Sequence, residues 1–81
     1  MIFGALADIY DDVEIGAAYR RPNAGPLVET AYVLSIAPDR MGIPHVCFDL
    51  EASRGISKPF VERRTLGLEA FRTQFCEKVQ E

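Results

Sequence analysis

The residues best suited to chemistry, His45, Cys47 and Asp49, occupy alternate positions in one short stretch of the chain. Alternate residues of a β-strand point to the same side, so a strand here would place an imidazole, a thiol and a carboxylate on one face. A nucleophilic thiol needs a base within about 3 Å and a third group that orients the base. His45 is the single histidine, and nothing else in the sequence supports a thiol–imidazole pair, so we predict that the protein is not an enzyme.

A mixed metal site could be built from the same face together with Cys76. Zinc sites usually show paired ligands such as Cys-x2-Cys or His-x3-His, and the sequence has neither pair. Gly55 and Gly67 also lack the neighbouring glycines of a phosphate-binding loop. We therefore predict no metal and no cofactor, and we expect Cys47 and Cys76 to be free thiols.

Two arginine pairs, at 20–21 and 63–64, fall in the first and last of the strands that we expect. In a small barrel these strands come together, and with the loop residues Arg40, Arg54 and Lys58 they would form a basic rim for phosphates or acidic peptide. Two tyrosines could add a stacking surface beside that rim. The predicted partner-binding residues are Tyr19, Arg20, Arg21, Tyr32, Arg40, Arg54, Arg63 and Arg64. The alternatives are that the arginines protect strand edges against aggregation and that the tyrosines belong to the core.

Four short runs with an alternating or β-branched pattern must position these residues. The clearest is 43–51, where Val46, Phe48 and Leu50 alternate with polar residues, as in a strand with one face in a core. Further strands are expected at 14–21, 27–37 and 60–66, and the even positions of 27–37 form the more apolar face. Proline and glycine mark the turns between them, with Gly42 suited to a positive φ.

Two segments show the periodicity of an amphipathic helix. Apolar residues recur at helical spacing near the N-terminus, so we predict a helix over 2–12, with a stripe made of Ile2, Phe3, Leu6, Ile9, Tyr10 and Val13. A second, closing helix is predicted over 69–79. The predicted buried core consists of Val46, Phe48, Leu50, Leu68, Phe71 and Phe75.

Together these elements predict a mainly β (α+β) fold in a single domain over 1–81, with a small SH3-like antiparallel barrel over 14–67 and a helix at each end. The run 16–20, the strand-turn-strand from Ala31 to Leu50 and the run 66–71 carry a resemblance that covers 14–76. In them the chain resembles the small SH3-like barrels found as uncharacterised single-domain bacterial proteins. The resemblance implies binding of peptides, nucleic acids or other subunits rather than catalysis.

Length and charge set further bounds. A core of 81 residues is only marginally stable alone, so a partner subunit would help. The net charge is −3, and its acidity is concentrated in residues 1–19, which contain four acids and no Lys or Arg. This distribution gives no global electrostatic field that would attract nucleic acid.

No apolar run approaches the roughly 20 residues that span a bilayer, and no signal peptide is evident, so we expect a cytoplasmic protein without membrane contact.

These observations lead us to predict a non-enzymatic protein–protein interaction module. The stripe over 2–13 is wider than a small barrel needs, and we expect it to act in self-association as a homodimer. The alternative for the stripe is that the helix covers one end of its own barrel. The alternative for the function is a nucleic-acid-binding accessory protein that uses the arginine rim.

Overall fold

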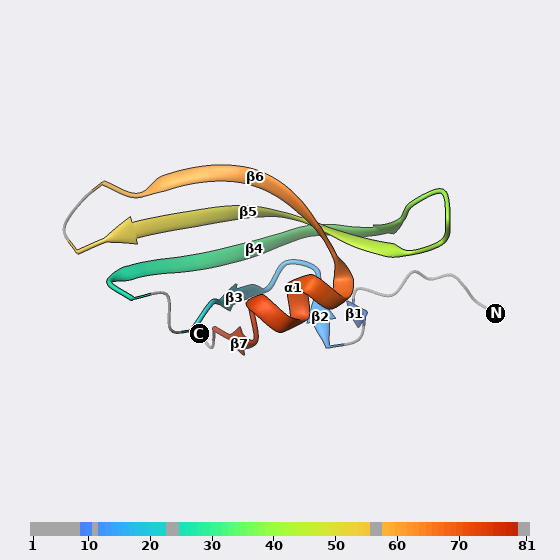
Figure 1. The fold of residues 1–81 in the computed structure, drawn as a ribbon, viewed down its shortest axis with the longest axis horizontal. Helices are drawn as coiled ribbons and strands as arrows, with labels where there is room; N and C mark the ends of the chain where they lie inside the picture. The colour runs from blue at the N-terminus through green and yellow to red at the C-terminus, as the bar shows by residue number, and fades with distance from the viewer. Residues whose placement is uncertain (1–8, 11, 23–24, 56–57, 80–81) are drawn as a thin grey trace.

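Two long strands, β4 (Leu27–Pro38) and β5 (Pro44–Arg54), form the central hairpin of the structure (Figure 1). The computed structural model describes residues 9–10, 12–22, 25–55 and 58–79. The hairpin loop is held by Asp39, whose Oδ1 accepts hydrogen bonds from the backbone N–H groups of Met41 (2.8 Å) and Ile43 (3.0 Å). Gly42 has φ of 82°, so the predicted loop and its positive φ are confirmed.

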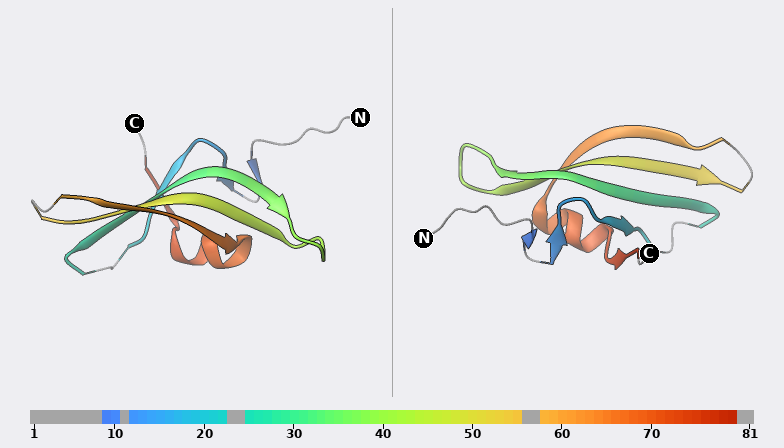
Figure 2. Two further views of the ribbon diagram at one scale, coloured as in Figure 1. Left: turned by 90° about the horizontal axis from the view of Figure 1, so that it is seen from above. Right: turned by 180° about the vertical axis from the view of Figure 1, so that it is seen from behind.

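The central hairpin belongs to a five-stranded antiparallel sheet with the strand order β6-β5-β4-β3-β7. The other strands of this sheet are β6 (Phe60–Gly67), β3 (Ala18–Arg20) and β7 (Glu77–Lys78). A separate two-stranded hairpin is formed by β1 (Ile9–Tyr10) and β2 (Val13–Glu14). The helix α1 (Leu68–Gln74) lies on one face of the sheet, as the two views of Figure 2 show.

The core lies between α1 and the side of the sheet that faces it. Phe48, Phe71 and Phe75 form its centre, with ring centroids 5.1 to 5.4 Å apart. All six residues predicted to be buried are buried, so the predicted strand parity of 43–51 is confirmed. The full buried apolar set is Val13, Tyr19, Ala31, Val33, Val46, Phe48, Leu50, Leu68, Phe71 and Phe75.

The predicted barrel is wrong, because the sheet is open. The outer strands β6 and β7 are at opposite ends of the strand order and do not pair with each other. The strand β3 has three residues and β7 has two, so this side of the sheet is too short to curl round and meet β6. The helix α1 covers the core side that a closed barrel would have enclosed.

The closing helix is shorter than the predicted 69–79. It ends at Gln74, and the chain then extends into β7, where Lys78 pairs with Tyr19 of β3. The backbone N–H of Val79 donates to the carbonyl oxygen of Ala18 (2.9 Å). The last predicted helical turn is therefore a strand, because its backbone groups find partners on the edge of the sheet.

The predicted helix over 2–12 is wrong where the structure describes it, because 9–10 and 13–14 form the β1–β2 hairpin. Asp12 turns the chain there with φ of 72°, which a helix does not allow. Among the predicted self-association residues, Ile9 and Tyr10 lie in β1, and Val13 is buried in the core. Ile2, Phe3 and Leu6 lie outside the described residues. The homodimer predicted through this helix therefore loses its basis.

The more apolar side of β4 faces away from the core. Ala31 and Val33 are buried, whereas Val28, Tyr32 and Leu34 are 46%, 44% and 39% exposed. We call this side of the sheet, away from α1, the open face. Cross-strand neighbours point to the same side, so the register assigns to the open face two rows, Ala18-Tyr32-Asp49-Arg63 and Arg20-Thr30-Glu51-Val61.

A β-bulge between Val33 and Ser35 changes the side to which β4 presents its residues. Beyond the bulge, Ile36 pairs with the buried Val46 and packs against the core. The extra residue thus lets both halves of the strand contribute to one core, although their parity differs.

The helix α1 has seven residues, and in the described part of the chain no helix is long and apolar enough to cross a bilayer.

Candidate functional site

The two tyrosines of the predicted site have different environments. Tyr19 is 4% exposed, and its ring packs edge-on against Phe71. Its hydroxyl donates to the carbonyl oxygen of Asp12 (3.1 Å) and accepts from the backbone N–H of Glu14 (2.8 Å). Tyr32 lies on the open face and is 44% exposed. Only Tyr32 is therefore accessible to a partner, and Tyr19 corresponds to the core alternative considered above.

The arginines of the predicted rim do not gather in one patch. Arg63 lies on the open face, and Arg64, the next residue of β6, points to the opposite side. Arg40 is in the β4–β5 loop and Arg54 is at the far end of β5, so the length of the sheet separates them.

Three of these arginines are paired with carboxylates. Ion pairs join Arg21 Nη1 to Glu29 Oε1 (3.1 Å), Arg63 Nε to Asp49 Oδ1 (2.9 Å) and Arg64 Nε to Glu62 Oε2 (3.2 Å). The partners compensate the positive charge locally, so these arginines do not create a continuous phosphate-binding surface.

The middle of the open face carries two fixed polar pairs. Arg63 donates to both carboxylate oxygens of Asp49, and this hydrogen bond and charge lower the pKa of Asp49 and raise the pKa of Arg63. Tyr32 donates its hydroxyl hydrogen to Glu51 Oε1 (2.9 Å), which raises the pKa of the Tyr32 phenol. Both pairs are exposed, so they orient polar groups on the surface more than they stabilise the fold.

A hollow of about 420 Å3 lies beside Tyr32 at the β3 side of the open face. We call it the sheet hollow. Its walls consist mostly of small or aliphatic residues, and the chain turns there through Gly16, whose φ is 91°. The ion pair between Lys78 Nζ and Glu14 Oε1 (2.6 Å) lies at its rim and raises the pKa of Lys78. The lining residues are Glu14, Ile15, Gly16, Ala17, Ala18, Tyr32, Lys78 and Val79.

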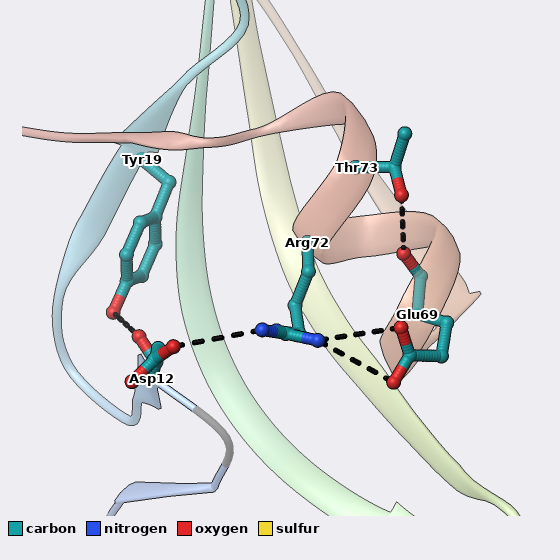
Figure 3. A network of polar contacts seen from close by, with 5 residues as sticks. All are labelled: Asp12, Tyr19, Glu69, Arg72 and Thr73. Atoms are coloured by element: carbon teal, nitrogen blue, oxygen red, sulfur yellow. Dashed lines mark hydrogen bonds and ion pairs between the residues drawn. The ribbon is translucent and has the colours of Figure 1, made fainter.

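A second hollow, of about 380 Å3, lies beside α1 and is lined by Asp12, Arg72, Phe75 and Cys76 among others. Arg72 lies between two carboxylates, with Nη2 3.5 Å from Asp12 Oδ2 and Nη1 3.3 Å from Glu69 Oε1 (Figure 3). Two carboxylates therefore compensate the guanidinium that faces this hollow. We infer no anion site from it.

The residues first considered for chemistry do not assemble a reactive centre. His45 Nδ1 lies 2.9 Å from the carbonyl oxygen of Ile43 and 3.7 Å from Asp39 Oδ2. Cys47 is half-buried and Cys76 is exposed beside α1, and both are free thiols. Within the described ranges, no three His, Cys, Asp or Glu side chains come close enough together to hold a metal ion.

The sequence reasoning missed the sheet hollow and the outward apolar side of β4. A signal for the hollow is present in the run Gly16-Ala17-Ala18, because small side chains next to a strand leave space at its edge. The direction of β4 could not be read, because no glycine or proline in 27–37 marks the bulge.

The Tyr32–Glu51 hydrogen bond predicts an elevated phenol pKa. In a pH titration followed by NMR, the Tyr32 ring signals should shift at higher pH than those of a free tyrosine. Glu51→Gln should lower that pKa, because it removes the negative charge that opposes phenolate formation. Glu69→Gln, which changes a carboxylate beside α1, is the matched control and should leave it unchanged. A Tyr32 titration that does not respond to Glu51→Gln would contradict the assigned contact.

Comparison with known proteins identifies no relative of this chain. No protein-family model matches the chain, and no curated protein or solved structure matches it significantly. The resemblance to SH3-like barrel proteins therefore stays a prediction, and function has to be argued from the surfaces themselves.

Proposed function

We propose that the chain is a non-enzymatic protein-interaction module that binds its partner on the open face. The observation that carries the proposal is the outward direction of the more apolar side of β4, with Val28, Tyr32 and Leu34 between 39% and 46% exposed. Grouped apolar and aromatic side chains on a solvent-facing sheet are typical of interaction surfaces. Tyrosine and arginine, both present here, are enriched at such interfaces.

The sheet hollow supports an anchoring role for the open face. Binding energy at protein interfaces is concentrated where an aromatic or aliphatic side chain fills a pocket that excludes water. The hollow next to Tyr32 has apolar walls from Ile15, Ala18 and Val79 and a charged rim from Glu14 and Lys78. This arrangement suits an apolar side chain of a partner, surrounded by polar contacts.

The fixed polar pairs of the open face would give the contact its specificity. Asp49 and Arg63 already hold each other, as do Glu51 and Tyr32, so little side-chain freedom is lost when a partner binds. Asp49 neutralises Arg63, and Glu51 adds a negative charge, so this part of the open face does not attract phosphate groups. This is why we favour a protein over a nucleic acid as the partner.

A cytoplasmic location belongs to the same proposal. It is supported by the two free thiols, Cys47 and Cys76, since proteins of reducing compartments keep their cysteines unpaired.

Partner capture with two matched variants tests the proposal. The wild-type chain is used to isolate a partner from a lysate of its native organism, and the purified partner is then titrated by calorimetry. Tyr32→Ala should weaken binding by roughly tenfold or more, because it removes the aromatic side chain that lines the sheet hollow. Met41→Ala is the control, since Met41 is 82% exposed in the hairpin loop and should leave the affinity unchanged.

Two outcomes would contradict the proposal. One is equal binding by the wild type and Tyr32→Ala, with both variants folded as judged by circular dichroism. The other is binding to random RNA or DNA that weakens steeply between low and moderate salt, because that dependence indicates phosphate contacts.

A further inference from the structure

The strand β6 is an edge of the sheet that no other strand of the described chain covers. It hydrogen-bonds to β5 on one side and lies at one end of the strand order. All residues from Phe60 to Thr65 are exposed. An eight-residue edge presents a row of unpaired backbone N–H and C=O groups, which is a template for another strand.

Two of the features that usually block an edge, a β-bulge and a proline, are missing from β6, although its charged residues Glu62, Arg63 and Arg64 remain. The register with β5 runs from Ala52 opposite Phe60 to His45 opposite Gly67 without a bulge. The strand also contains no proline. The other edge, β7, has only two residues. Of the two outer strands of this sheet, β6 is therefore the one that favours strand addition.

The side chains of β6 are complementary to a second copy of the same strand. Two antiparallel copies related by a two-fold axis through Arg63 place Glu62 opposite Arg64 of the other copy, and Arg64 opposite its Glu62. Within one chain these two residues already pair, with Arg64 Nε 3.2 Å from Glu62 Oε2. In the dimer, Glu62 and Arg64 of the two copies would form a square of four alternating charges. Each glutamate would then have an arginine as its neighbour both along its own strand and across the interface.

The remaining pairs of that register are also compatible. Phe60 falls opposite Leu66 of the second copy, and Val61 falls opposite Thr65. These contacts would cover Phe60 and Val61, which are 54% and 60% exposed in the single chain. The two Arg63 residues meet at the axis, where the Asp49 of each chain already neutralises its own arginine at 2.9 Å.

Neighbouring two-fold registers are less favourable. An axis through Glu62 places that residue opposite its own copy and shortens the paired segment. An axis through Arg64 sets Glu62 against Leu66 in place of Arg64, so the complementary square is lost.

We infer that β6 pairs with β6 of a second copy, centred on Arg63, to form a continuous ten-stranded sheet. The axis is perpendicular to the sheet, so the open faces of the two copies point to the same side. This inference rests on β6 alone and does not depend on the proposed function of the open face.

Charge reversal at the two positions gives a sharp test by light scattering over a range of protein concentrations. The wild type should be dimeric. E62R places arginine opposite arginine twice, and R64E places glutamate opposite glutamate twice, so each variant alone should associate more weakly by roughly tenfold or more. An equimolar mixture of E62R and R64E should form heterodimers, and the double variant E62R/R64E should regain the homodimer, because both combinations restore opposite charges.

The restored pairs separate association from folding, since a variant that failed to fold would not be rescued by a partner charge. Both side chains are exposed, at 44% for Glu62 and 50% for Arg64, so circular dichroism should show the same fold in all variants. A wild type that stays monomeric at the highest concentration reached would overturn the inference. So would a dimer whose association is unchanged by every charge reversal.

Discussion

Replacing Phe48 with alanine is expected to lower the free energy of unfolding by about 3 to 5 kcal/mol, as measured by urea denaturation. Phe48 is 1% exposed, and its ring lies 5.1 Å from that of Phe71 and 5.4 Å from that of Phe75. The variant loses the buried apolar area and both aromatic contacts, and it leaves a cavity between β5 and α1. This is a large fraction of the stability of a domain of this size.

The control for this prediction is Phe60→Ala, measured at a concentration low enough to keep the chain monomeric. Phe60 is 54% exposed, so its truncation should change stability by a few tenths of a kcal/mol. If Phe48→Ala shows no cooperative transition at all, Phe48→Leu should show a smaller, measurable loss, because leucine leaves less empty volume. Equal stability of the Phe48 and Phe60 alanine variants would contradict the described core.

Replacing Tyr19 with phenylalanine is expected to lower the free energy of unfolding by about 1 to 3 kcal/mol. The substitution keeps the ring in the core and removes only the hydroxyl. The backbone N–H of Glu14 then loses its acceptor at 2.8 Å, and the carbonyl oxygen of Asp12 loses its donor at 3.1 Å. Because that hydroxyl ties the β1–β2 segment to the sheet, the loss should also increase amide hydrogen exchange in β2.

Tyr32→Phe is the matched control for Tyr19→Phe, because it removes a hydroxyl that bonds to Glu51 on the open face. An exposed hydroxyl and carboxylate regain hydrogen bonds to water, so stability should change by a few tenths of a kcal/mol at most. A larger loss for Tyr32→Phe than for Tyr19→Phe would reverse the placement of the two tyrosines.

The part of the fold that could be predicted from the sequence is the part that depends on local pattern. The alternation of Val46, Phe48 and Leu50 identified the central strand and its buried side, because a half-buried strand needs this period. The apolar spacing of Leu68 and Phe71 likewise identified α1. Proline and glycine predicted the loop with Gly42 at positive φ.

The errors arose where pairing between distant segments decides the structure. Residues 76–79 have a helical period, but β7 follows α1 because its backbone bonds to β3. The N-terminal stripe fits helical spacing equally well, whereas the turn at Asp12 makes residues 9–14 a hairpin. A closed barrel was predicted from four strand-like runs followed by a segment with helical period, whereas the short strands β3 and β7 leave the sheet open.

The candidate site was predictable only in part, since its members depend on the side to which each strand residue points. Tyr32 was named with Tyr19, although the two occupy opposite faces of the sheet. Cys47 and Asp49 were correctly expected on one side of their strand. The contacts of Asp49 with Arg63 and of Glu51 with Tyr32 depend on the register between strands, which the sequence does not specify.

The pairing of β3 with β7 has a consequence for the biosynthesis of the chain. Tyr19 is among the first core residues to be translated, and its strand partner Lys78 is among the last of the described residues. Phe71 and Phe75, which fill the core, are also late. The β4–β5 segment therefore emerges from the ribosome before its hydrophobic cover, and the core is expected to form only after Phe75 and Lys78 have emerged. Until then the uncovered strands are the kind of segment that chaperones bind.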